Sequence, residues 1–260
     1  MTTERGSKIN QLLQSQPKGV VFLASWLSQN GYSSDLQKRY RKSNWLKSIG
    51  TGAMVRTGDE VNYEGALFAL QKQTTSSIHP GGKTALSLLG KSHYLQFSTK
   101  RITLFGGKGE SLPIWFRNYD WGVEFNHYQS GFLPKDLGLT QIERKNFTLK
   151  ISNAARALME CLYLIPKYQE LHECYELMEG LNNLRPKEVQ KLLEACTSIK
   201  VKRLFLFLAD KAGHSWFNYM DVDKIDLGKG KRSIVKGGIY IPKYQITVNK
   251  ELGLKDERDL

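Results

Sequence analysis

The residues of this chain that best suit a chemical role are basic ones gathered in one short run. Four cations fall within five residues, at Lys38, Arg39, Arg41 and Lys42. If the run is helical, a rotation of about 100° per residue turns Leu36 and Tyr40 inward. The outward residues are then Ser34, Gln37, Lys38 and Arg41. A hydroxyl, an amide and two cations on one exposed face suit contact with the phosphates and base edges of nucleic acid.

The elements that must position this face form a recognisable order. A short apolar helix is predicted over residues 22–29, a turn at Asn30-Gly31, and a second helix behind Ser33 and Ser34. Residues 45–49 and 53–56 are predicted as two strands joined at Gly50–Gly52. This is the order of a winged helix-turn-helix, which places its second helix in the DNA major groove. The predicted DNA-contacting residues are Ser34, Gln37, Lys38, Arg39, Arg41, Lys42, Lys47 and Arg56.

A second basic group lies in the C-terminal half. A Gly-rich loop over residues 228–238 contains Lys229, Lys231, Arg232 and Lys236, and an apolar segment opens with Lys200, Lys202 and Arg203. The loop is either a flexible solvated segment or a second contact for phosphates or an acidic partner. The cations of the apolar segment either cover the core while keeping their charges in water or join that second contact.

Other reactive side chains form no familiar catalytic arrangement. The histidines never fall three or four residues apart, and the one carboxylate cluster, at Asp221, Asp223 and Asp226, has no further ligand nearby. Gly82-Lys83-Thr84 imitates the end of a phosphate-binding loop, but Ser77 stands where that motif needs glycine. The cysteines, expected to be small buried apolar residues, are Cys161, Cys174 and Cys196. We therefore expect no enzyme activity, no cofactor and no metal.

Composition narrows the class of partner. The 260 residues carry a net charge of +13 and the isoelectric point is about 9.5, so the surface favours a polyanion such as nucleic acid. Hydrophobic residues make up 40% of the chain, which is typical of a folded protein. The longest apolar stretch, residues 204–209, is too short to cross a bilayer, and the first ten residues lack the apolar core of a signal peptide. A cytoplasmic location is expected.

The rest of the pattern predicts an α+β protein: an N-terminal winged helix-turn-helix followed by a mainly helical C-terminal domain with a small β-sheet. Helices are expected over residues 3–14 and 61–74, extended segments at 94–97 and 101–105, and mostly helices beyond Ser152. Residues 199–210 read equally well as a buried helix or a strand. We place the seam near residues 90–100, which gives domains 1–95 and 96–260.

Several sequence blocks in a fixed order resemble one known family. After the winged helix come NYEGAL at 62–67 and HPGGKTAL at 79–86, and the C-terminal half adds SNAARA at 152–157, MEGL at 178–181 and VKRLFL at 201–206. This order is similar to that of the AbiEi antitoxins, the transcriptional regulators of type IV toxin–antitoxin systems. The resemblance runs over nearly the whole chain, and the order of the blocks is more specific than any one block.

The resemblance implies two coupled activities. The winged helix of such a regulator binds repeats in double-stranded DNA of its own promoter and represses it. The C-terminal domain counters a cognate nucleotidyltransferase-like toxin, and basic side chains there assist DNA binding, which would suit Lys229, Lys231 and Arg232. No membrane partner is implied.

Two other functions stay open at this point. One is a stand-alone DNA-binding regulator whose C-terminal domain dimerises or binds an effector, in which case the aromatic residues between Trp115 and Tyr128 could line a pocket rather than a core. The other is an enzyme that acts on nucleic acid or nucleotides through a carboxylate–metal site around Asp221 and Asp223.

Overall fold

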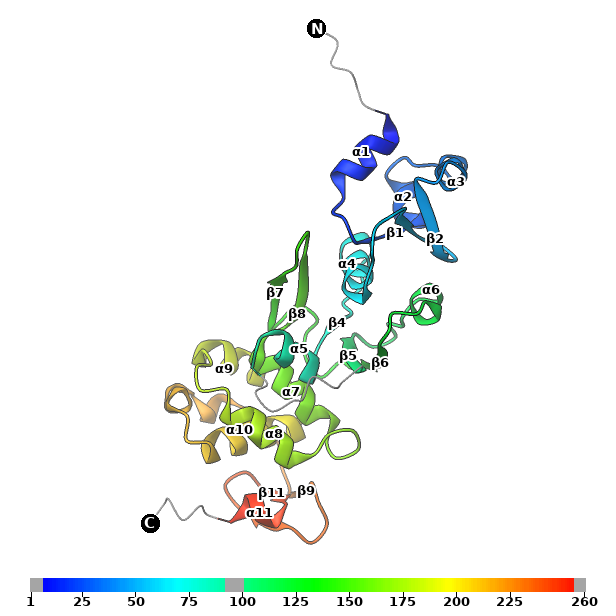
Figure 1. Cartoon of the computed structure of the whole chain (residues 1–260). Helices are drawn as coiled ribbons and strands as arrows, with labels where there is room; N and C mark the ends of the chain where they lie inside the picture. Colours follow the sequence, from blue (N-terminus) through cyan, green and yellow to red (C-terminus); the bar gives the residue numbers. More distant parts are fainter. Residues whose placement is uncertain (1–6, 92–100, 255–260) are drawn as a thin grey trace. The chain divides into compact units, whose positions relative to one another are not determined.

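The computed structural model describes residues 7–91 and 101–254, shown in Figure 1 with the sequence running from blue to red. They divide into two units. One contains the described residues within 1–79, 100–129 and 141–150, and the other those within 80–99, 130–140 and 151–260. The units do not follow a single seam near residues 90–100, because segments beyond that point return to the N-terminal unit. The extended segment predicted at 94–97 and the start of the first predicted helix lie outside the described residues.

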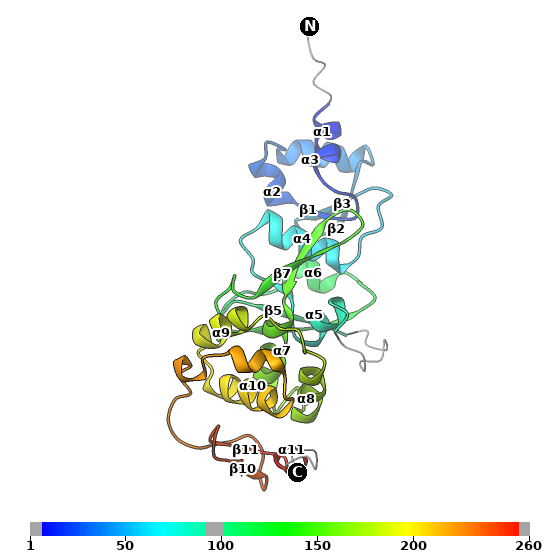
Figure 2. The same ribbon diagram turned by 90° about the vertical axis from the view of Figure 1, so that its left-hand side faces the viewer.

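The first unit begins with helices around a small sheet. In order these elements are α1 (Lys8–Ser15), β1 (Val21–Leu23), α2 (Ala24–Gln29), α3 (Ser34–Lys42), β2 (Leu46–Gly50) and β3 (Ala53–Arg56). The strands form an antiparallel sheet in the order β1-β3-β2. Leu12, Phe22, Leu27, Tyr40 and Met54 belong to the core beneath the helices. Figures 1 and 2 show α2 and α3 side by side. Residues 22 and 23, predicted as the start of a helix, belong to strand β1 because they pair with β3.

Helix α4 (Tyr63–Gln73) follows and is buried along most of its length. Asn62 caps it by accepting hydrogen bonds from the backbone N–H groups of Glu64 and Gly65. At its other end the Gln73 amide accepts from Leu23 N at 2.8 Å and donates to Val21 O at 2.7 Å. These two bonds attach α4 to β1, so the helix and the N-terminal sheet share one framework.

The remaining elements of the first unit come from beyond residue 100. Strand β5 (Arg101–Gly106) pairs with β4 (His79–Pro80) and runs parallel to β6 (Glu124–Gln129). Between them lies α6 (Ile114–Asn118), which packs on β2. The approach is close, since a Cβ at Gly50 would lie 2.8 Å from Trp115 Cβ. This segment beyond residue 100 thus supplies a helix that supports the β2–β3 hairpin. Strands β7 (Leu139–Glu143) and β8 (Thr148–Ser152) pair and carry the chain between units.

The second unit is mainly helical. Its helices are α5 (Gly82–Leu88), α7 (Ala154–Leu164), α8 (Leu171–Glu179), α9 (Pro186–Ala195) and α10 (Ile199–Lys211). Helices α5 and α10 pack on α7. The ambiguous segment at 199–210 is helix α10, and its residues 201–209 are all buried. Two 3₁₀ turns, Ser215–Tyr219 and Val222–Lys224, lead to the last elements, β9 (Arg232–Ser233), β10 (Ile239–Ile241), β11 (Ile246–Val248) and α11 (Lys250–Gly253). Helices with small sheets agree with the predicted mixed α+β class.

Candidate nucleic-acid interface

Helix α3 carries the basic run, and its ends are set by local chemistry. Ser33 is its N-cap and accepts a hydrogen bond from Leu36 N at 3.3 Å. Asp35 lies in the first turn, whereas Arg39, Arg41 and Lys42 occupy the last. This distribution complements the helix dipole, which favours negative charge at the N-terminus and positive charge at the C-terminus. The helix therefore forms where it was predicted, with its cations gathered at one end.

Gln37 does not face outward, so the prediction for this residue is wrong. Only 4% of it is exposed, and its Nε2 donates to Ala24 O, Ser28 Oγ and Tyr32 O at 3.1, 3.0 and 2.7 Å. The amide thus satisfies polar atoms in α2 and the following turn and holds α2 against α3. Periodicity missed this role because a glutamine looks the same in sequence whether its partner is water or a buried carbonyl.

The burial of Gln37 beside Tyr40 shifts the centre of the exposed face. At about 100° per residue, Lys38 and Lys42 lie roughly opposite Tyr40, and Arg41 lies near the boundary with the buried face. Ser34, Lys38, Arg39, Arg41 and Lys42 are all exposed. Within the described part of the chain, none of these four cations forms an ion pair with a carboxylate. The face is therefore available to an anionic partner.

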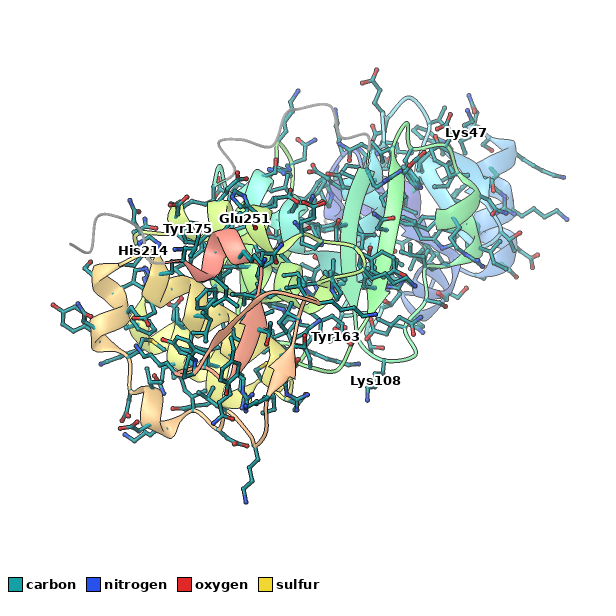
Figure 3. All side chains as sticks on the ribbon, turned by 90° about the horizontal axis from the view of Figure 1, so that it is seen from below. Lys47, Lys108, Tyr163, Tyr175, His214 and Glu251 are labelled. Carbon is teal, nitrogen blue, oxygen red and sulfur yellow. The ribbon has the colours of Figure 1, made fainter. Side chains whose placement is uncertain are left out.

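The hairpin beside α3 contributes one exposed cation rather than two. Lys47 projects from β2 (Figure 3) and is exposed. Arg56 on β3 is instead turned inward, with its side chain 15% exposed, and donates to Leu13 O and Gln16 O at the end of α1. Its Nε lies 3.9 Å from the Asp59 carboxylate. Arg56 therefore ties α1 to the sheet, and its predicted place as an exposed hairpin cation is wrong.

Three of the predicted C-terminal cations are structural. Arg203 is 1% exposed and donates to the carbonyl oxygens of Leu227, Gly228, Gly230 and Gln245. Lys202 donates to Asp226 O at 3.0 Å, and Lys200 donates to Tyr163 O and Ile165 O. Burial lowers the pKa of Lys200 and of Arg203. Because backbone carbonyls accept hydrogen bonds from the charged groups of all three residues, these cations join elements of the second unit rather than form a second basic contact.

The basic loop itself lies at the surface. Lys229, Lys231, Arg232 and Lys236 are all exposed. Lys231 Nζ lies 4.9 Å from the centre of the Tyr240 ring, a cation–π contact that leaves its outer side open. Arg203 holds the start of this loop from inside, through the carbonyls of Leu227, Gly228 and Gly230. The second unit thus presents four cations on a loop fixed by a buried arginine.

The segment Gly82-Lys83-Thr84, which imitates the end of a phosphate-binding loop, does not offer its first backbone N–H group to a phosphate. Gly82 N, at the start of α5, donates to the carboxylate of Glu160 at 2.9 Å. Glu160 is fully buried and also accepts from Ser152 Oγ and Arg156 Nε. The chain's own carboxylate therefore occupies the place of an anion, and the helix start is structural.

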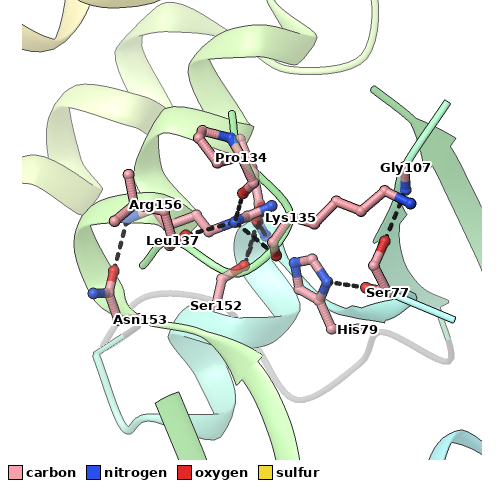
Figure 4. A network of polar contacts seen from close by, with 11 residues as sticks. Ser77, His79, Gly107, Pro134, Lys135, Leu137, Ser152, Asn153 and Arg156 are labelled. Atoms are coloured by element: carbon pink, nitrogen blue, oxygen red, sulfur yellow. Dashed lines mark hydrogen bonds and ion pairs between the residues drawn. The ribbon is translucent and has the colours of Figure 1, made fainter. Parts of the chain in front are cut away.

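Arg156 extends this network, as Figure 4 shows. Its Nη1 donates to Pro134 O at 2.8 Å and Leu137 O at 2.6 Å. Asn153 caps α7 by accepting from Arg156 N at 2.9 Å. Ser152 is free for the carboxylate because the helix begins one residue later. Figure 4 also draws residues of the first unit, where His79 Nδ1 lies 2.6 Å from Ser77 O.

The acidic cluster near residue 221 and the three cysteines do not form a catalytic or metal site among the described residues. Asp221 pairs with Lys224 at 2.7 Å, and Asp226 Oδ1 accepts from Gly228 N. Over residues 7–91 and 101–254, no three His, Cys, Asp or Glu side chains are placed to hold a metal ion. Cys161, Cys174 and Cys196 are free and buried, as predicted, and burial raises the pKa of each thiol.

The aromatic residues of the 115–128 region divide between a core and a pocket. Phe116 is fully buried against Trp115, Trp121 and Phe125. An open pocket of about 680 Å³ adjoins this cluster. Its lining residues are Ser111, Leu112, Phe116, Arg117, Val123, Glu124, Phe125 and His127. The two alternatives left open by the sequence are thus both present in the first unit.

Comparison with known families decides what this arrangement belongs to. The profile described as "Transcriptional regulator, AbiEi antitoxin N-terminal domain" matches residues 5–97, and "Transcriptional regulator, AbiEi antitoxin, Type IV TA system" matches residues 99–249. The chain belongs to the AbiEi family. It is accordingly a member of a family of antitoxins and transcriptional regulators of type IV toxin–antitoxin systems. The resemblance predicted from the sequence blocks is confirmed.

Other comparisons add a fold match. The structure is similar to the crystal structure of the RV2827C protein from Mycobacterium tuberculosis, with a TM-score of 0.55 and 15% sequence identity. The match covers 92% of this chain and 89% of that chain, and at this identity it establishes the fold alone. A search of curated proteins gave no match. None of the described helices has the length and apolar character needed to cross a bilayer.

Proposed function

We propose that this AbiEi-family chain is an antitoxin and an autoregulatory repressor that binds repeats in its own promoter DNA. In this proposal α1–β3 is a winged helix-turn-helix, with α3 as its recognition helix and the β2–β3 hairpin as its wing. The observation that carries the proposal is the exposed face of α3. Lys38, Arg39 and Lys42 lie there without a carboxylate partner among the described residues.

The shifted exposed face suggests how the contacts divide. Ser34 at the N-terminal end of α3 and Lys38 at the centre of its exposed face are suited to base edges in the major groove. Lys42 and Lys47, at the end of α3 and on the hairpin, are suited to phosphates. Lys229, Lys231, Arg232 and Lys236 are proposed as a second phosphate contact from the exposed C-terminal loop.

The other half of the proposal is neutralisation of a toxin. We assign this role to the C-terminal family domain, with 1–95 and 96–260 as the two functional domains. The support is the family match over residues 99–249, described as an antitoxin of a type IV system. The proposed target is a cognate nucleotidyltransferase-like toxin.

Binding to promoter DNA can be tested by fluorescence anisotropy in a salt series. The full chain should bind duplex DNA from upstream of its own gene about 10³-fold more tightly than a scrambled duplex of equal length. Lys38→Ala should reduce this ratio. Arg185→Ala removes one exposed cation at the N-cap of α9 and serves as the charge-matched control. Equal binding of both duplexes that disappears with salt would refute site-specific regulation and leave only the effect of net charge.

One observation favours a second candidate, a stand-alone regulator controlled by an effector. The pocket of about 680 Å³ lies beside α6, the helix that packs on β2. Co-expression with a nucleotidyltransferase-like toxin, cloned where one is encoded beside this gene, separates the candidates. Rescue of growth by the full chain supports the antitoxin. Growth arrest that persists while promoter repression remains intact supports the stand-alone regulator.

A further inference from the structure

A hollow lies between the end of α3 and the β2–β3 hairpin, which contact each other beside it. Its volume is about 440 Å³. It is lined by Ala24, Arg41, Ser48, Gly50, Thr51, Gly52, Ala53 and Met54, all of which belong to the first unit. No carboxylate lines it. Three of its hairpin residues are exposed, Ser48 and Thr51 with a hydroxyl and Gly52 with its backbone. The hollow is therefore a polar, cationic recess with room for a group larger than water.

Arg41 is the only charged side chain in this recess, and it lacks a strong hydrogen-bond acceptor. Its Nη1 donates to the Met54 thioether sulfur at 3.2 Å, and no other acceptor for it is found within the described residues. A thioether is a weak acceptor, whereas a guanidinium presents five N–H donors in a planar fork that matches carboxylate or phosphate oxygens. The arrangement holds the guanidinium in place but leaves most of its donor capacity unused.

The position of Arg41 on the helix separates it from Lys38. With Tyr40 and Gln37 buried, Arg41 lies at the edge of the exposed face, about 60° from Lys38 and toward the hairpin. There the Arg41 side chain contacts Met54 of β3 and lines the hollow. It is therefore poorly placed to enter the groove that the centre of the helix would face.

Ser48, on β2, supplies a second polar group to the lining. Its Oγ donates to Gly50 O at 3.2 Å, a long bond within the exposed hairpin that can be exchanged for another acceptor. Thr51 adds a hydroxyl for which the described residues supply no hydrogen-bond partner. A guanidinium and two hydroxyls that line one recess suit a tetrahedral oxyanion.

We propose that this recess holds one backbone phosphate of bound DNA, with Arg41 as its principal donor and Ser48 as a second. The inference rests on the proposed DNA-binding function and assigns Arg41 to the phosphates, where the sequence left both phosphates and base edges open. In place of reading a base, Arg41 fixes the register of α3 and the hairpin on the sugar–phosphate backbone. Base reading then falls to the centre of the α3 face.

The test combines variants of the protein with DNA duplexes in which a single phosphate is replaced by a neutral group. Upstream duplexes are made with one neutral methylphosphonate at a time and titrated by anisotropy. For the wild-type chain, at least one position should weaken binding about fivefold or more. In Arg41→Ala the sensitivity of one such position should disappear while the others remain. In Lys38→Ala that same position should stay sensitive, and Ser48→Ala should reduce its effect only in part.

A salt series with unmodified DNA gives an independent reading. Arg41→Ala should weaken binding to upstream and scrambled duplexes by the same factor and lower the slope of log K against log salt by about 0.9. Arg41→Lys should recover the slope with less affinity, because an ammonium keeps the charge but loses the fork. Thermal unfolding of each variant confirms that it is folded.

Two results would overturn the inference. One is a larger loss for the upstream than for the scrambled duplex in Arg41→Ala, which would make Arg41 a base contact. The other is a methylphosphonate pattern unchanged by Arg41→Ala. Discrimination by the wild-type chain reports on the proposed function, whereas the change in pattern reports on the recess, so either can fail visibly without the other.

Discussion

Two helices of this protein carry similar basic runs, but one run is exposed and the other is buried. On α3, the cations of residues 38–42 are exposed and have no carboxylate partner among the described residues. On α10, Lys202 and Arg203 are 4% and 1% exposed and donate to backbone carbonyls near the C-terminal sheet. Charge in a sequence therefore does not identify a binding surface. What decides is whether the fold already supplies the acceptors.

The same contrast appears between neighbours within α3. Lys38 is exposed, whereas Gln37, one residue earlier, is buried and joins α3 to α2. A rotation of about 100° separates the two side chains. Removing an inward polar group should cost stability, and removing an outward one should cost binding.

The largest effect on stability is expected for Arg203→Met. It would leave the carbonyls of Leu227, Gly228 and Gly230 without their donor, and we expect a loss of about 3–4 kcal/mol in the free energy of unfolding. Urea denaturation measures this loss. Arg232→Met, which removes an exposed cation from the same loop, should change stability by less than about 0.5 kcal/mol. Equal losses in the two variants would break the comparison.

A smaller loss is expected for Gln37→Met, which keeps the size of the side chain and removes its donors. Ala24 O and Tyr32 O would lose a buried partner, so the free energy of unfolding should fall by about 1–3 kcal/mol. Denaturation and DNA anisotropy are measured on the same samples. Under conditions where the variant is folded, it should keep the wild-type preference among base substitutions. A relaxed preference at one base pair would restore Gln37 as a DNA contact.

Lys200 gives a pH-dependent effect that is smaller again. Burial lowers its pKa in the folded chain, so between that value and about 10.4 the unfolded chain binds more protons. Stability contributed by this group should therefore rise as pH increases through that window and be lost as pH falls. The change should stay below about 1 kcal/mol because the ammonium is partly solvated. Urea denaturation from pH 8 to 10.5 should show a steeper rise for the wild type than for Lys200→Met, and parallel curves would contradict this.

The smallest effect on stability is expected for Lys38→Ala, at less than about 0.5 kcal/mol. Its effect on DNA should be the reverse, with a lower ratio of upstream to scrambled binding, because the exposed ammonium is proposed to reach base edges. Thermal unfolding and anisotropy together give both values. A variant that lost stability but kept its DNA preference would place Lys38 among the structural cations and remove the contrast with α10.

Much of the fold followed from local patterns. Ser33 and the apolar pair Leu36 and Tyr40 predicted helix α3, and glycines around residue 51 predicted the β2–β3 hairpin. The Gly82 segment was correctly set aside because Ser77 breaks the phosphate-loop motif. The family resemblance required only blocks of sequence in a fixed order. These features depend on residues near one another in the chain, which is why periodicity and spacing could reveal them.

The site itself was only partly predictable. The outward residues of α3 were assigned from a helical wheel, which is correct for Lys38 and wrong for Gln37. Arg56 could not be distinguished from an exposed hairpin cation, because its acceptors, Leu13 O and Gln16 O, lie about forty residues earlier. Ser48 gave no signal at all, since a single serine on a hairpin is common.

By itself the sequence determined helix α3, the β2–β3 hairpin, the excess of positive charge, and membership of the AbiEi family. Only the tertiary structure decided which cations remain free. Glu160 meets Gly82 N across 78 residues, and α6 reaches β2 from beyond residue 100. Local propensity is encoded by neighbours in the chain, but satisfaction of a charge depends on acceptors brought together by folding. For that reason, the basic run on α3 forms a candidate DNA surface. The similar run on α10 donates hydrogen bonds to backbone carbonyls inside the second unit.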